Sequence, residues 1–254
     1  MNLSRGKWQP VCELVVAWIV LLAVMSVGIL FEKLKLTVTT SALLEEITVL
    51  LVLWGLNHYW LKVHLQWRTD QSFGTQVRVN AFSLVLVVLF LASLEMQLAH
   101  GKGVKHVVVM ALVALLVAVF EETFFRGVLL VGFLQRIGRG DAVWLAVLLS
   151  STLFAASHLI NLLHQPVSLT IAQVLMAFGF GLLQSATYLR SGSLIWPILL
   201  HFVLDTQALT RDGLMANTHV PAWSGFMPLV VYGIVALILL RRSKRTEIVT
   251  RFKA

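Results

Sequence analysis

Eight apolar segments, most of them about twenty residues long, run through this chain of 254 residues. A stretch of about that length is what an α-helix needs to cross the hydrocarbon core of a bilayer. Within such a helix the backbone polar groups bond to one another, as a membrane requires. The sequence therefore predicts an all-α fold, a polytopic transmembrane helix bundle with about eight spans. The segments are 11–31, 42–63, 79–99, 106–134, 142–163, 168–189, 194–209 and 226–240.

The overall composition supports a membrane protein. Hydrophobic residues make up 58% of the chain and charged residues 13%, against about 45–50% and about 25% in soluble domains. A single cysteine, Cys12, excludes an intrachain disulfide and a cysteine-based zinc cluster. Arg5 and Lys7 precede the first apolar segment as in a signal peptide, but that segment has no clear small-x-small cleavage site. We therefore expect a retained first helix.

The positive charge follows the connections between segments and is no sign of nucleic-acid binding. With eight spans, 14 Lys and Arg residues fall on the side of both termini and 5 on the other side. The positive-inside rule then places both termini in the cytoplasm, with the chain in the cell (inner) membrane. Residues 241–254 read as a basic cytoplasmic tail. No long linker divides the chain, so we predict one membrane-embedded domain, 1–254, with its motif-bearing core at about 106–209.

Ionisable residues inside apolar segments mark the candidate site, because each costs roughly 2.5–3.5 kcal/mol on insertion scales. In the fourth segment, Glu121, Glu122 and Arg126 follow a long uncharged stretch. Glu122 and Arg126 are four residues apart and can pair on one helix face. Glu121 is turned about 100° away and is left to face another group. The alternative is that all three only hold helices together.

Histidines in two later segments extend the polar set. His158 lies in the fifth segment, which a tight Gly138–Arg139–Gly140 connection joins to the fourth. Glu121 and His158 are equidistant from that turn, so we expect them to meet at one depth of an antiparallel pair. In the seventh segment, His201 and Asp205 are four apart and share a helix face. Glu45 and Glu46 are expected at a solvated helix start.

A carboxylate buried next to a histidine is suited to take a proton from water. The polar set therefore indicates hydrolysis of a bond that is presented within the membrane. An ion pair or packing role is the competing interpretation for each residue taken alone, and it weakens because three polar clusters occur on three apolar helices.

These residues resemble the motifs of the CAAX prenyl protease-like (CPBP or ABI) family of intramembrane endopeptidases. Its pattern is Glu-Glu-x-x-x-Arg, then Phe-x-x-x-His, then His-x-x-x-Asn/Asp, and here the three motifs are Glu121–Arg126, Phe154–His158 and His201–Asp205. The resemblance covers roughly residues 106–209 and implies an eight-span bundle with a peptidase site. It implies that Glu121 activates water with help from His158, that Glu122 and Arg126 organise the site, and that His201 and Asp205 stabilise the oxyanion.

Two points stay open on the sequence alone. An ionised aspartate cannot donate a hydrogen bond, so Asp205 either is protonated or orients His201. Glu121, His158, His201 and Asp205 could also bind zinc, but there is no His-Glu-x-x-His helix. We therefore expect a glutamic peptidase without a cofactor, and a zinc metallopeptidase is the second mechanism.

The predicted partners are a membrane-associated peptide or protein substrate and the lipid bilayer. No nucleic acid is expected, and the sequence predicts no oligomeric state. The alternative function is a non-catalytic binding or immunity protein on the same scaffold, which should tolerate Glu121→Gln. A proton-coupled or ion transporter is a third hypothesis, although the paired repeats or broken helices typical of many transporters are not evident.

Overall fold

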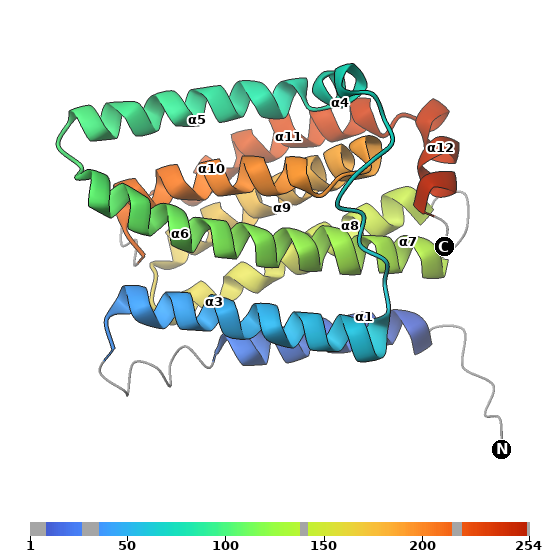
Figure 1. The fold of residues 1–254 in the computed structure, drawn as a ribbon, viewed down its shortest axis with the longest axis horizontal. Helices are drawn as coiled ribbons and strands as arrows, with labels where there is room; N and C mark the ends of the chain where they lie inside the picture. The colour runs from blue at the N-terminus through green and yellow to red at the C-terminus, as the bar shows by residue number, and fades with distance from the viewer. Residues whose placement is uncertain (1–8, 27–35, 138–141, 215–219, 253–254) are drawn as a thin grey trace.

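The computed structural model describes residues 9–26, 36–137, 142–214 and 220–252, and every regular element within these ranges is a helix (Figure 1). The predicted all-α class is thus confirmed. The elements are α1 (Gln9–Met25), α3 (Val38–Gly55), the π-helix η1 (Leu56–Leu61), α4 (Phe73–Val79), α5 (Ala81–Ala99), α6 (Val104–Glu121), the π-helix η2 (Glu122–Leu130), α7 (Val131–Ile137), α8 (Ala142–Ser157), the 3₁₀-helix η3 (His158–Leu163), α9 (Val167–Ser191), α10 (Ile195–Asp212), the 3₁₀-helix η4 (Ala222–Gly225), α11 (Phe226–Leu239) and α12 (Arg242–Phe252).

Each of the eight predicted segments contains a helix, and six helical stretches among the described residues are long and apolar enough to cross a membrane. The helix of the first segment is apolar but shorter, and α10 holds three charged residues. Large apolar side chains lie open on the outside, among them Leu51, Val88 and Leu237, which are 64%, 65% and 60% exposed. Such an exterior suits lipid, so the chain is an integral multi-pass membrane protein. The six stretches are Val38–Leu61, Ala81–Ala99, Val104–Ile137, Ala142–Leu163, Val167–Ser191 and Ala222–Leu239.

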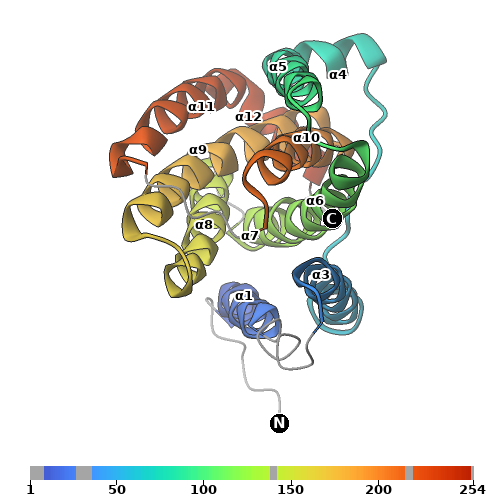
Figure 2. The same cartoon turned by 90° about the vertical axis from the view of Figure 1, so that its left-hand side faces the viewer.

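Seen along the helices, the bundle is built in rows (Figure 2). α1 and α3 lie together on one side, and α3 packs on α6. The continuous helix α6–η2–α7 and its neighbour α8 occupy the middle. α9 and α10 follow, with α5 and α11 on the far side. The helix that carries Glu121 is therefore surrounded by other helices, as a polar site inside a membrane requires.

Two helices lie where the sequence predicted only a connection and a tail. α4 forms part of the connection 62–78, and α12 forms most of the tail 241–254. The predicted basic tail is thus largely helical, and Ile248 and Phe252, four residues apart, form a buried apolar stripe at 0% and 3% exposure that docks it on the bundle. α12 lies across the end of the bundle, with contacts to α7 and α8 (Figure 1).

Some sequence predictions concern residues outside the described ranges. These are the Gly138–Arg139–Gly140 turn, the basic pair Arg5 and Lys7, and the end of the first segment after residue 26. Pro197 is the third residue of α10 and so lies in its first turn, where a missing N–H leaves no helical bond unmade.

A buried carboxylate, histidine and arginine cluster

The helix that carries the first motif changes its winding at the motif. α6 ends at Glu121, and the nine residues of η2, from Glu122 to Leu130, form a π-helix in which every residue is buried. π-helical turns are rare and occur often at functional sites. The wider turn alters the directions in which Glu121, Glu122 and Arg126 project, compared with an ideal α-helix.

Glu122 and Arg126 form the predicted ion pair. Nη1 of Arg126 lies 3.0 Å from Oε1 of Glu122, and the two side chains are 1% and 0% exposed. The guanidinium also lies over the ring of Phe154, with Cζ 4.3 Å from the ring centre. A buried pair of this kind holds its two partners tightly, because separating them would leave an unpaired charge away from water.

His201 on α10 joins this pair to the other two carboxylates. Its Nδ1 lies 2.7 Å from Oε1 of Glu122. Its Nε2 lies 3.5 Å from Oε2 of Glu121 and 3.3 Å from Oδ2 of Asp205. The two contacts of Nε2 are longer than a typical hydrogen bond. Nε2 therefore faces the space between Glu121 and Asp205 and makes a short hydrogen bond with neither.

His158 is held at the cluster by its own helix. Its Nδ1 lies 2.9 Å from the carbonyl oxygen of Phe154, and the structure gives no hydrogen bond between His158 and Glu121. The predicted meeting assumed ideal α-helices, whereas η2 follows Glu121 directly and η3 begins at His158. Because the carbonyl only accepts, Nδ1 carries the proton and Nε2 is left as an acceptor.

Phe154 is the platform on which these groups are arranged. Its ring centre lies 5.0 Å from that of His158 and 6.1 Å from that of His201, both edge-on. Together with the Arg126 contact, three motif residues from three helices touch one aromatic ring. Edge-to-face contacts of this kind favour definite ring orientations.

Exposure divides the cluster into a sealed part and an open part. The side chains of Glu122, Arg126 and His201 are 0%, 1% and 6% exposed, whereas those of Glu121 and Asp205 are 12% and 22% exposed. Glu121 and Asp205 are therefore the carboxylates that a bound molecule can reach.

Glu46 on α3 is a further carboxylate near the cluster, and the sequence reasoning missed it. The expectation of a solvated helix start is wrong, because α3 begins at Val38 and Oε2 of Glu46 is buried without a hydrogen-bond partner. Its charge acts on Glu121, Asp205 and His201. The available signal was its place on one helix face with buried Val49 and Leu53, three and seven residues later.

A metal site was tested against the same side chains. Among the described residues, no three or more His, Cys, Asp and Glu side chains converge as a metal site. Both ring nitrogens of His201 face carboxylates, and Nδ1 of His158 is bonded to the backbone. The four residues considered for zinc thus do not form one ligand set as arranged here.

An all-helical membrane bundle around a buried cluster of carboxylates, histidines and an arginine defines the class of this protein. Residues 103–207 match the family described as type II CAAX prenyl endopeptidase Rce1-like. This part of the chain, which holds all six predicted site residues, matches that family, and the predicted resemblance to CAAX protease-like proteins is confirmed.

One curated relative comes from Escherichia coli and is described as an uncharacterized 24.3 kDa protein. It is 31% identical over 149 residues, which are 55% of this chain and 64% of that protein. The chain thus spans just under two thirds of that relative's length. No solved structure matches.

Proposed function

We propose that the protein is an intramembrane endopeptidase that hydrolyses a peptide bond in a membrane-associated protein or peptide. The observation that carries the proposal is the carboxylate of Glu121, which lies 3.5 Å from Nε2 of His201 and, with Asp205, on the reachable side of the cluster, whereas Glu122 and Arg126 are sealed. The Rce1-like family of residues 103–207 supports a peptidase.

In the proposed reaction Glu121 acts as general base. It takes a proton from a water molecule whose oxygen attacks the carbonyl carbon of the substrate. His158 assists through Nε2, the nitrogen that its backbone bond leaves as an acceptor. When the C–N bond breaks, the leaving nitrogen takes the proton from Glu121. The second proton of the water stays on the new carboxyl group, so atoms and charges balance without a cofactor and the products are a carboxylic acid and an amine.

His201 is suited to stabilise the oxyanion of the tetrahedral intermediate. Because Nδ1 donates to the carboxylate of Glu122 at 2.7 Å, this role requires the imidazolium form, with a second proton on Nε2. The Nε2–H group then points between Glu121 and Asp205, over contacts long enough for a substrate oxygen to replace. In this proposal Asp205 orients the ring, which is the role that an ionised aspartate can perform because it only accepts hydrogen bonds. Glu122 and Arg126 hold the other face of the ring through Nδ1.

The proposal extends to the setting of the enzyme. We propose one domain over residues 1–254 in the cell (inner) membrane, with both termini in the cytoplasm. The excess of Lys and Arg on that side supports the orientation. The partners are the lipid bilayer and the polypeptide substrate, with no resident cofactor and no nucleic acid.

The test compares binding with cleavage in liposomes. A library of labelled membrane peptides is incubated with the wild type and Glu121→Gln, with and without a zinc chelator. We expect cleavage that the substitution abolishes and the chelator spares, while peptide binding persists in Glu121→Gln. Loss of cleavage with the chelator, restored by zinc, would favour the metallopeptidase. Binding without cleavage by the wild type would favour the binding protein.

A further inference from the structure

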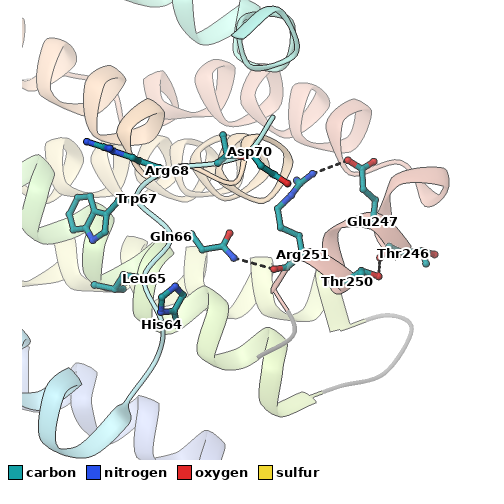
Figure 3. A pocket seen from close by; sticks show the side chains of 11 residues that line it. His64, Leu65, Gln66, Trp67, Arg68, Asp70, Thr246, Glu247, Thr250 and Arg251 are labelled. Atoms are coloured by element: carbon teal, nitrogen blue, oxygen red, sulfur yellow. Dashed lines mark hydrogen bonds and ion pairs between the residues drawn. The ribbon is translucent and has the colours of Figure 1, made fainter. Parts of the chain in front are cut away.

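A large polar groove lies at the end of the bundle, away from the cluster. One wall is residues 64–70, which follow η1, and the other is α12 (Figure 3). The groove has a volume of about 880 Å³, in the upper part of the range of about 300–1,000 Å³ for ligand sites. The residues that face it from α12 are Thr246, Glu247, Thr250 and Arg251.

The two walls of the groove are fastened together. Nε2 of Gln66 donates to the carbonyl oxygen of Arg251 at 3.1 Å, as the dashed line in Figure 3 shows. Nη1 of Arg251 donates to the carbonyl oxygens of Leu189 and Arg190 at 3.2 and 3.0 Å, and Nη2 lies 3.0 Å from Oε1 of Glu247. The groove is therefore preformed, which lowers the entropy cost of binding.

The lining of the groove favours a polar polypeptide over an anion. Arg251 is already bonded to two carbonyls and Glu247, and Asp70 and Glu247 would repel a phosphate. What is left is a mixture of hydroxyl, amide and charged groups of both signs, including Thr246, Thr250 and Arg68. Such a mixture of donors and acceptors suits the alternating N–H and C=O groups of a peptide backbone.

The groove shares a wall with a smaller cavity beside the motif helix. His64, Leu65 and Trp67 line both, and the second cavity, of about 440 Å³, is bounded by Thr123 of η2. Leu65 packs onto that helix so closely that its Cδ2 lies 2.7 Å from the place a Cβ would take at Gly127. The hydroxyl of Thr123 is buried without a partner. Residues 64–67 thus separate the groove at the end of the bundle from Thr123, which directly follows Glu122 in the chain.

We propose that the polar groove binds the polar segment of the polypeptide substrate whose membrane-embedded segment is cleaved at Glu121. The inference rests on the proposed function and assigns the substrate class: a chain with a polar stretch at the membrane surface that continues into the bilayer. The groove lies on the side that the charge distribution places in the cytoplasm, so the polar stretch is cytoplasmic.

The test uses a variant that fills the groove and a matched control. Thr250→Trp places a large ring in the groove, and Ser243→Trp places the same ring on α12 outside the lining; both positions are exposed. The probes are library peptides in two forms, with and without the polar segment next to the membrane-embedded segment. kcat and KM are measured in liposomes of neutral lipid and of mixed neutral and anionic lipid. Peptide Kd is measured on Glu121→Gln, alone and combined with each tryptophan.

We expect Thr250→Trp to raise KM and Kd for the long peptide by about tenfold, as for two lost hydrogen bonds. The short peptide should be unaffected, and Ser243→Trp should behave as the parent. If KM and Kd were equal for the long and short peptides, or if both tryptophan variants had equal effects, the groove would not bind the polar segment. Cleavage by the wild type would still support the peptidase in that case. An effect of Thr250→Trp seen only with anionic lipid, and for both peptides, would assign the groove to lipid head groups instead. Binding without any cleavage would refute the peptidase and leave Kd to decide on the groove.

Discussion

The pair of Glu122 and Arg126 allows a quantitative prediction about stability. In Arg126→Met the carboxylate of Glu122, which is 0% exposed, loses the guanidinium that pairs with it. Removing one partner of a buried ion pair costs about 3–5 kcal/mol. The contact of the guanidinium with Phe154 at 4.3 Å is lost as well. At about 2–4 °C per kcal/mol for a chain of this size, the unfolding midpoint should fall by roughly 6–20 °C.

The assay is thermal unfolding in one detergent of the wild type, Arg126→Met, Glu122→Gln and the double variant. Because the double variant leaves no buried charge unpaired, we expect it to unfold at a higher temperature than Arg126→Met. The coupling between the two positions should exceed about 1 kcal/mol, as for residues in direct contact. Strict additivity of the two substitutions, or a midpoint for Arg126→Met within 2 °C or so of the wild type, would refute the assignment of a tightly coupled buried pair.

Three further predictions concern stability away from that pair. Glu46→Gln should raise the unfolding temperature, because it removes a carboxyl group whose Oε2 is buried without a hydrogen-bond partner; a lower midpoint would contradict this. Gly179→Ala should destabilise by about 1–3 kcal/mol, since its Cβ would lie 2.5 Å from Cα of Leu229; the control Gly74→Ala meets nothing within 4 Å and should not destabilise. Burial raises the pKa of Glu247, but neighbouring basic side chains lower it by more, so its folded pKa lies below the ordinary 4.5. The stabilisation of α12 by Glu247 is then fully present above pH 4.5 and is lost as the pH falls through the lower folded pKa. Amide hydrogen exchange in α12 should therefore increase over that pH range in the wild type and show no such increase in Glu247→Gln.

The helices and the identity of the cluster could be predicted from the sequence because both follow from local patterns. Long apolar runs predict helices whatever their neighbours, and the spacing of Glu122 and Arg126 brings them to one face. The orientation of side chains on neighbouring helices relative to one another could not be predicted in the same way. The π-helix η2 and the 3₁₀-helix η3, which begin at Glu122 and His158, were not predicted, because the reasoning assumed uniform α-helices.

Two further differences concern residues whose burial was not recognised from the sequence. Glu46 looked like a helix-end residue because the start of α3 was placed four residues too late, at 42 instead of Val38. α12 looked like a tail because its charges outnumber its apolar residues, although Ile248 and Phe252 suffice to dock it. In α12, two buried apolar side chains on an otherwise polar stretch hold the helix against the bundle.

The role of Glu121 is tested most directly by the rate at which the protein hydrolyses a membrane peptide in chelator-treated liposomes. The comparison is between wild type, Glu121→Gln and Glu95→Gln, an exposed carboxylate in α5 that serves as the control. A general base contributes typically 10²–10⁴-fold, so kcat of Glu121→Gln should fall by at least about a hundredfold while Glu95→Gln matches the wild type. Equal rates for Glu121→Gln and the wild type would contradict the assignment of Glu121 as the base.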